Sequence, residues 1–142
     1  MNYGILGIDW GASKVGVAVA NTETRLAMGV TTFRNDEYLL ENLEKTIKEY
    51  EIQLVVIGNP VRNAYLTDAS SEPSQEKPLS GGEILGATLE KKFGLRVVYH
   101  NEMYTTKMAR ANLVEKGAHH LDQQDDREAA RLILQSWLDA QK

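Results

Sequence analysis

The sequence predicts an α/β domain in which a mixed β-sheet is covered by helices on both faces. Residues 4–33 contain three strand-like segments joined by short turns, and the rest of the chain alternates helical patterns with short apolar runs. Hairpin-linked strands followed by alternating helices and strands give a mixed sheet. With 142 residues, of which 42% are hydrophobic, the chain has the size of one domain, residues 1–142, with a sizeable core.

The chain opens with a predicted hairpin and a third strand. Residues 4–20 read GILGIDWGASKVGVAVA, in which apolar residues lead up to Asp9, a turn of small residues follows, and three valines then alternate with small residues. This pattern places Asp9 at the mouth of a hairpin. A third strand is expected over residues 25–33, after the polar turn at 21–24.

Helices and further strands follow. Asn35 or Asp36 is a suitable cap for a helix whose apolar residues recur at helical spacing as far as Tyr50. The run IQLVVI at 52–57 is typical of a central parallel strand. The remaining predicted elements are a polar loop at 61–79, a helix from a Ser80–Glu83 capping box to Phe93 that ends at Gly94, a strand at 95–99, and helices at 105–116 and 125–140.

Composition excludes several classes of protein. There is no cysteine, so disulfides and thiolate metal sites are excluded. The net charge of −4 argues against a broad basic surface that would bind nucleic acid by charge alone. The N-terminal apolar run is too short for a signal peptide or a membrane span. We therefore expect a soluble, cytoplasmic protein that does not contact membranes.

Three acidic residues are expected at one edge of the sheet. Asp9 lies at the end of the first strand, Glu102 lies just past the last strand, and Asp126 shares an inward helical face with Ala130 and Ile133. Two simpler interpretations stay open: Asp9 could cap its turn, and Asp126 could balance the dipole of its helix.

A divalent metal ion would explain why such acids gather. Three carboxylates with no inward basic partner in sequence reach would repel one another, and ligation by oxygen alone suits Mg²⁺ or Mn²⁺. Two such ions about 3.5–4 Å apart can activate water and stabilise the leaving oxygen of a phosphodiester. The expected chemistry is hydrolysis of a nucleic-acid backbone.

Other polar residues give weaker signals. Lys107 and Arg110 share a helical face, and the threonine at 105 can cap a helix N-terminus that attracts phosphate, although ordinary solvated charges would look the same. The histidines at 100, 119 and 120 do not have the spacing of a zinc site, because two of them are adjacent. We expect them to be surface residues.

Several of these motifs together resemble the YqgF family (RuvX-like), which comprises Holliday-junction resolvase-like or pre-16S rRNA nucleases. The resemblance rests on GIDWGASKVGVAVA, on GNP at 58–60, on Glu102 with the threonines at 105 and 106, and on DREAARLILQSWL at 126–138. It covers nearly the whole chain. It implies an RNase H-like fold with a five-stranded sheet in the order 3-2-1-4-5, in which only the second strand is antiparallel.

The resemblance also implies a site and a substrate. Asp9, Glu102 and Asp126 would be the catalytic, metal-binding acids, with Mg²⁺ or Mn²⁺ as cofactor. The substrate would be a ribosomal RNA precursor or branched DNA. Monomer and homodimer both stay open. The residues expected to contact substrate are Lys14, Asn63, Thr105, Lys107 and Arg110.

This chain departs from the family pattern at several positions. The family usually has Lys-Arg where this chain has Ser13-Lys14, and Asp-Glu-Arg where it has Asn101-Glu102-Met103. The loop after Pro60 lacks the usual Asp-Gly pair, although Asn63 matches. These losses leave open a catalytically silent binding module on the same fold. Actin-like and sugar-kinase ATPases share a GIDxG hairpin, but they need two such domains to enclose ATP.

Overall fold

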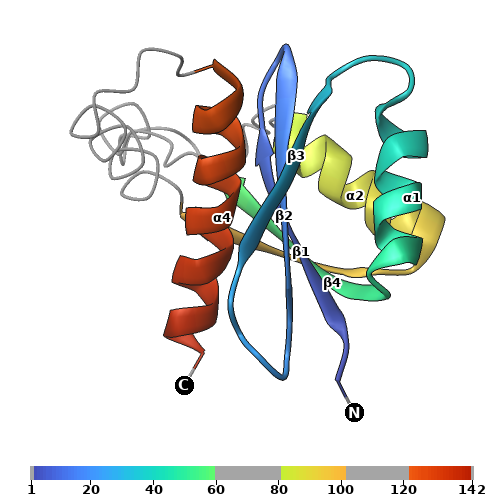
Figure 1. Cartoon of the computed structure of the whole chain (residues 1–142). Helices are drawn as coiled ribbons and strands as arrows, with labels where there is room; N and C mark the ends of the chain where they lie inside the picture. The colour runs from blue at the N-terminus through green and yellow to red at the C-terminus, as the bar shows by residue number, and fades with distance from the viewer. Residues whose placement is uncertain (1, 60–80, 102–121, 142) are drawn as a thin grey trace, which may run out of the picture.

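The computed structural model of the chain describes residues 2–59, 81–101 and 122–141. Its strands form a five-stranded sheet in the order β3-β2-β1-β4-β5, and helices lie on both of its faces (Figure 1). The elements, in chain order, are β1 (Gly4–Trp10), β2 (Lys14–Asn21), β3 (Met28–Arg34), α1 (Leu39–Glu49), β4 (Ile52–Asn59), α2 (Gly81–Phe93), β5 (Arg96–Asn101) and α4 (Asp122–Ala140).

Strand directions confirm the predicted topology. β2 pairs antiparallel with both β1 and β3, whereas β4 pairs parallel with both β1 and β5. Only β2 therefore runs against the others, in the predicted order 3-2-1-4-5. Within the described ranges no helix is both long and apolar enough to cross a membrane.

Two hydrophobic cores lie on opposite faces of the sheet because successive strand residues point to opposite sides. Leu6 and Ile8 of β1 belong to the core under α1 and α2. Ile5 belongs to the second core, which α4 covers with Ala130 and Leu134. Figure 1 shows α4 on one side of the sheet and α1 with α2 on the other. β1 and β4 are buried from both sides, as their continuous apolar runs predict.

The predicted cap of α1 is wrong in position. α1 begins at Leu39, its N-cap is Tyr38, and no side chain caps it. Asp36 instead accepts a hydrogen bond from the Tyr38 N–H at 2.9 Å and so forms a turn before the helix. The Asn35 side chain donates to the Gly11 carbonyl oxygen at 2.7 Å. Asn35 thus stabilises the β1–β2 turn instead of capping a helix.

Other predicted boundaries are mostly confirmed. α2 ends at Phe93, and Gly94 follows in the left-handed region with a φ of 67°. α4 starts at Asp122, three residues before the predicted start at 125. The predicted loop at 61–79, the cap residue Ser80 and the predicted helix at 105–116 lie outside the described residues.

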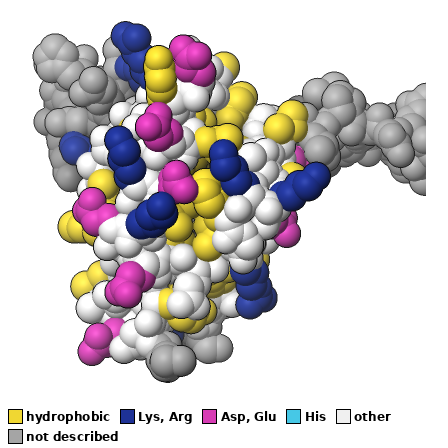
Figure 2. Space-filling view, turned by 90° about the vertical axis from the view of Figure 1, so that its right-hand side faces the viewer, with side chains coloured by type: hydrophobic (Ala, Val, Ile, Leu, Met, Phe, Trp, Pro, Cys, Tyr) yellow, Lys and Arg dark blue, Asp and Glu magenta, His cyan; other side chains and the backbone are white. Residues whose placement is uncertain are grey.

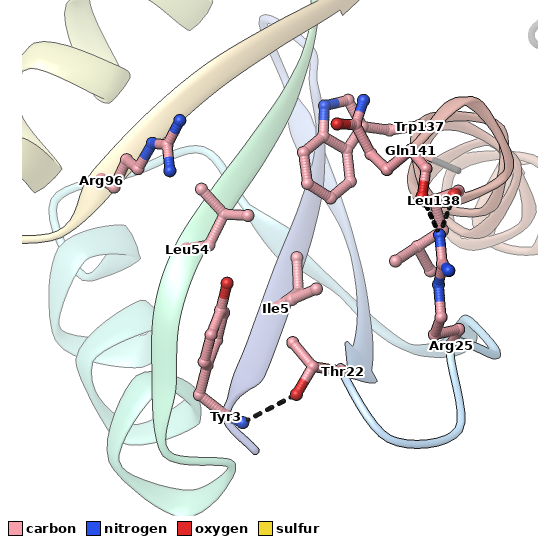
Figure 3. Close-up of a pocket in the computed structure, with 9 residues that line it drawn as sticks. All are labelled: Tyr3, Ile5, Thr22, Arg25, Leu54, Arg96, Trp137, Leu138 and Gln141. Carbon is pink, nitrogen blue, oxygen red and sulfur yellow. Dashed lines mark hydrogen bonds between the residues drawn. The ribbon is translucent and has the colours of Figure 1, made fainter. Parts of the chain in front are cut away.

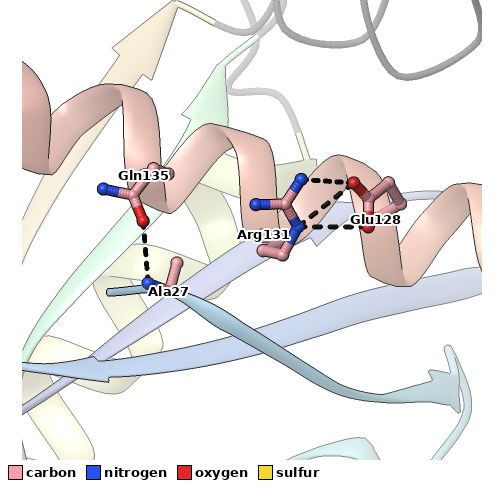
Figure 4. Close-up of polar contacts among 4 residues, drawn as sticks. All are labelled: Ala27, Glu128, Arg131 and Gln135. Atoms are coloured by element: carbon pink, nitrogen blue, oxygen red, sulfur yellow. Dashed lines mark hydrogen bonds and ion pairs between the residues drawn. The ribbon is translucent and has the colours of Figure 1, made fainter. Parts of the chain in front are cut away.

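The third strand starts later than predicted, because residues 25–27 bind α4 instead of pairing with β2. The Gln135 side chain accepts from the Ala27 N–H at 2.8 Å and donates to the Arg25 carbonyl oxygen at 3.2 Å. Figure 4 shows Gln135 reaching from α4 to Ala27. The Arg25 guanidinium donates to the carbonyl oxygens of Leu138 and Gln141 at the end of α4. These contacts replace ladder hydrogen bonds that β2 does not supply.

Replacing Gln135 by alanine is expected to lower the free energy of unfolding by about 1–2 kcal/mol, since the half-buried Ala27 N–H loses its partner. Urea denaturation followed by circular dichroism measures this loss. The matched control is Asp139→Ala, which removes only an exposed hydrogen bond to the same glutamine. Equal losses in the two variants would show that the bonds of Gln135 to residues 25 and 27 contribute nothing.

Candidate active site

Asp9 lies on the α4 face of the sheet, one residue before the end of β1. Ile5 faces the α4 core, and a Cβ atom on Gly7 would lie 2.7 Å from the Leu134 Cβ of that helix. Because side chains alternate along a strand, Asp9 points to the same side. Its side chain is half-buried. The hairpin position predicted for it is confirmed.

Glycines flank Asp9 on both neighbouring strands. Asp9 pairs with Gly16 of β2. On the other side Ile8 pairs with Ile57 of β4, so the next step along this register brings Gly58 beside Asp9. Neither glycine carries a side chain that could cover the carboxylate. No side chain from the strand neighbours of Asp9 therefore lies beside its carboxylate.

The first turns of α4 lie at the Asp9 end of the sheet. A Cβ on Gly7 would lie 3.2 Å from the Ala130 carbonyl oxygen, and Leu138, further along α4, packs in the same core as Ile5. α4 therefore runs antiparallel to β1. Two strand residues advance about 6.6 Å and one helical turn about 5.4 Å, so the backbone of Asp126, one turn before Ala130, lies near the level of Asp9.

β5 brings a histidine to the same face. His100 pairs with Gly58, which places it two strands from Asp9 at about the same level. Its Nε2 lies 2.9 Å from the Ser136 Oγ of α4, and burial lowers the pKa of the imidazole. The expectation of a surface histidine is therefore wrong for His100, because it faces α4 like Val98 two residues before it. His119 and His120 lie outside the described residues.

Three basic residues lie on the α4 face of the sheet, on the β3 side of Asp9. Lys14 opens β2 and pairs with Arg34 at the end of β3. Their neighbours Val15 and Phe33 face the α1–α2 core, so alternation turns Lys14 and Arg34 toward the α4 face. The exposed Arg127 of α4 passes over Gly29 of β3, whose Cβ would lie 2.6 Å from the arginine Cγ. We call Lys14, Arg34 and Arg127 the basic cluster.

Arg34 and Arg127 were missed by the sequence reasoning. The pairing of Lys14 with Arg34 depends on an irregularity in the β2–β3 register at Val17 and Ala18, which the local sequence pattern does not predict. Arg127 had no local signal either, because its position depends on how α4 crosses β3. Arg131, one turn later, is held by Glu128 in a bidentate pair that raises the pKa of the guanidinium (Figure 4).

The structure does not describe the side chains of the other predicted site residues. The Asp126 backbone belongs to α4, but its side chain is outside the described set. Glu102 directly follows the last residue of β5, and it lies outside the described residues together with the predicted substrate contacts Asn63, Thr105, Lys107 and Arg110. In the described part of the chain, no group of three His, Cys, Asp or Glu side chains could hold a metal ion.

Comparisons with known proteins agree with this architecture. The family model RuvX, described as Holliday junction resolvase, matches residues 4–140. A protein of Lactobacillus delbrueckii subsp. bulgaricus, named "Putative pre-16S rRNA nuclease", is 34% identical over 97% of each chain. A protein of the same name from Caldanaerobacter subterraneus subsp. tengcongensis is 32% identical over 97% of each chain.

Two solved structures share the fold at low sequence identity. Thermus thermophilus RuvC, in complex with a Holliday junction substrate, has a TM-score of 0.56 at 15% identity and covers 97% of this chain and 94% of its own. Fowlpox virus resolvase, in complex with Holliday junction DNA, has a TM-score of 0.57 at 10% identity, covering 96% and 97%. These likenesses confirm the RNase H-like fold. By the family model and by relatives that match nearly end to end, the chain belongs to the RuvX family.

Proposed function

We propose that this chain is a nuclease that hydrolyses phosphodiester bonds with a divalent metal ion held at Asp9, Glu102 and Asp126. The observation that carries the proposal is the position of Asp9, half-buried between Gly16 and Gly58 and level with the start of α4. Membership of the RuvX family and relatives named as nucleases support it.

The donor chemistry fits Mg²⁺ or Mn²⁺. Carboxylate oxygens are the ligands that these ions prefer, and the glycines paired beside Asp9 carry no side chain that would compete with it for the ion. Asp9 and Asp126 would hold the ion, and Glu102 would complete the ligand set or orient the attacking water. A metal ion bound there would supply an activated water and stabilise the leaving oxygen.

The basic cluster supports a nucleic-acid substrate in spite of the net charge of −4. Lys14, Arg34 and Arg127 would hold backbone phosphates beside Asp9, and such contacts do not depend on sequence. The family pattern has two basic residues in the first turn, and this chain has only Lys14 there. Arg34 and Arg127 supply positive charge in place of the second one. Their presence favours an active nuclease over a silent binding module. Figure 2 shows that the opposite face, with α1 and α2, carries acids and bases interspersed.

The substrate class follows from the relatives' names. A ribosomal RNA precursor is our first candidate, because the relatives at 31–35% identity are named for pre-16S rRNA. Branched DNA is the second, because the family model is described as Holliday junction resolvase. An activity on ribosomal RNA precursors would place the chain in the cytoplasm.

Purified protein with labelled RNA precursor ends, single strands, duplexes and four-way junctions tests the proposal. We expect cleavage of at least one substrate in Mn²⁺ or Mg²⁺ and none after chelation. Binding without cleavage in either metal would contradict the nuclease and favour the silent module.

Replacing Arg34 by alanine is expected to raise KM for the cleaved substrate about threefold to tenfold and to reduce the salt dependence of binding by about one phosphate contact. kcat should change less, because Arg34 holds the backbone rather than the reacting atoms. Steady-state kinetics at several salt concentrations measures both effects. Lys45→Ala, which removes an exposed charge from α1 on the opposite face, is the control. Equal effects in the two variants would show that the basic cluster does not bind substrate.

A further inference from the structure

A pocket opens at the end of the sheet opposite Asp9, between the start of β1 and the end of α4. Its volume is about 380 Å³, within the range of about 300–1,000 Å³ that is usual for small-molecule sites. Figure 3 shows its walls. The lining residues are Tyr3, Ile5, Thr22, Arg25, Leu54, Arg96, Trp137, Leu138 and Gln141.

Aromatic and aliphatic side chains form most of the pocket wall. Figure 3 shows the rings of Tyr3 and Trp137 on two sides of Ile5 and Leu54, which lie on adjacent strands. Both aromatic side chains are half-buried, so part of each ring is accessible from the pocket. Flat rings across an apolar floor are the surroundings that a planar aromatic ligand prefers.

Three polar side chains with no hydrogen bond to another described residue border the same pocket. The exposed guanidinium of Arg96 makes no hydrogen bond or ion pair with another described residue. Among the same residues, the Tyr3 hydroxyl and the Trp137 indole N–H are likewise without a hydrogen-bond partner. A guanidinium and two neutral donors in one pocket favour a ligand with a negative charge and further acceptors.

Arg25 makes the pocket more favourable for an anion. The C-terminal end of α4 borders the pocket, and the unsatisfied carbonyl groups of a helix end carry partial negative charge. Arg25 donates to two of these groups, the carbonyl oxygens of Leu138 and Gln141, and so offsets that charge. The end of α4 therefore repels an anion in the pocket less than it would without Arg25.

We propose that this pocket binds a nucleotide, with the base between Tyr3 and Trp137 and the phosphate on Arg96. The nucleotide is free in solution or part of a strand, since the same chemistry recognises both. Tyr3 and Asp9 are six residues apart along the β1 segment, a separation of about 20 Å. The pocket is thus a second site, independent of the metal site under Proposed function.

The test is a titration with adenosine monophosphate, followed by calorimetry and by the fluorescence of Trp137. We expect saturable binding with quenching that disappears in Trp137→Phe, where only Trp10 still emits. Arg96→Ala should weaken binding about tenfold, because a charge-assisted hydrogen bond is lost. Lys91→Ala, which removes an exposed charge from α2, should bind like the wild type. Adenosine and inorganic phosphate should each bind more weakly than the nucleotide.

A short single-stranded oligonucleotide distinguishes the two sources of the ligand. If it binds with the same dependence on Arg96 and Trp137 while the mononucleotide does not, the occupant is part of a strand. If neither probe quenches Trp137, or if Arg96→Ala binds both as tightly as the wild type, the proposal is overturned. Running the titrations also on Asp9→Asn keeps the result separate from the nuclease, because that variant should bind at the pocket unchanged.

Discussion

Asp9→Asn is expected to abolish Mn²⁺-dependent cleavage while leaving the fold intact. The substitution keeps the shape of the side chain but removes the charge that holds the ion. Metal-ion catalysis contributes several kcal/mol to the reaction, so the rate should fall on the order of 100-fold or more. Cleavage of the labelled substrate at saturating Mn²⁺ measures the loss, and circular dichroism verifies the fold.

A thermal scan gives a second readout of the same substitution. Because an ion that binds only the folded state stabilises it, Mn²⁺ should raise the Tm of the wild type and leave that of Asp9→Asn nearly unchanged. Asp36→Asn is the matched control, since it makes the same chemical change at an exposed residue before α1 and should behave like the wild type. If Asp9→Asn cleaves near the wild-type rate, Asp9 is not a ligand of the catalytic metal.

Gly7→Ala is expected to lower the free energy of unfolding by about 1–3 kcal/mol. The added Cβ would lie 2.7 Å from the Leu134 Cβ and 3.2 Å from the Ala130 carbonyl oxygen, so α4 must move away from β1. That movement would also carry Asp126 away from Asp9, and the concentration of Mn²⁺ needed for half-maximal cleavage should rise. Urea denaturation and a metal titration measure the two effects.

Gly29→Ala is the contrasting variant. Its added Cβ would lie 2.6 Å from the Arg127 Cγ and 3.3 Å from the Arg127 carbonyl oxygen. The exposed Arg127 side chain can relieve the shorter contact by rotating about χ1, whereas the 2.7 Å contact at Gly7 is with a Cβ that moves only with the α4 backbone. We expect a smaller loss of stability than for Gly7→Ala. Equal losses of stability in the two variants would show that the fit of α4 against β1 does not cause the loss in Gly7→Ala.

Local sequence patterns determined the strands and helices that bury a clear apolar face. The valines of β2, the run IQLVVI of β4 and the helical spacing in α1 each predict one element, because the period of burial differs between strands and helices. Asp9 was identified in the same way, since a carboxylate at the end of an otherwise apolar strand is costly without a partner. The strand order came from the resemblance to a family rather than from the pattern.

Contacts between distant segments decided the boundaries of some elements, the surroundings of Asp9 and the pocket. Asn35 bonds the β1–β2 turn instead of capping α1. Gln135 delays the start of β3 by binding Ala27 and Arg25, which are 108 and 110 residues away in sequence. The glycines beside Asp9, the approach of Arg127 over β3 and the pocket near Arg96 all depend on register and on how α4 crosses the sheet. Local patterns were enough to identify the apolar faces and the unusual acid, Asp9. Which polar groups meet depends on the packing of distant segments, because a hydrogen bond or a pocket needs atoms from several of them. Burial periodicity, in contrast, is a property of each segment alone.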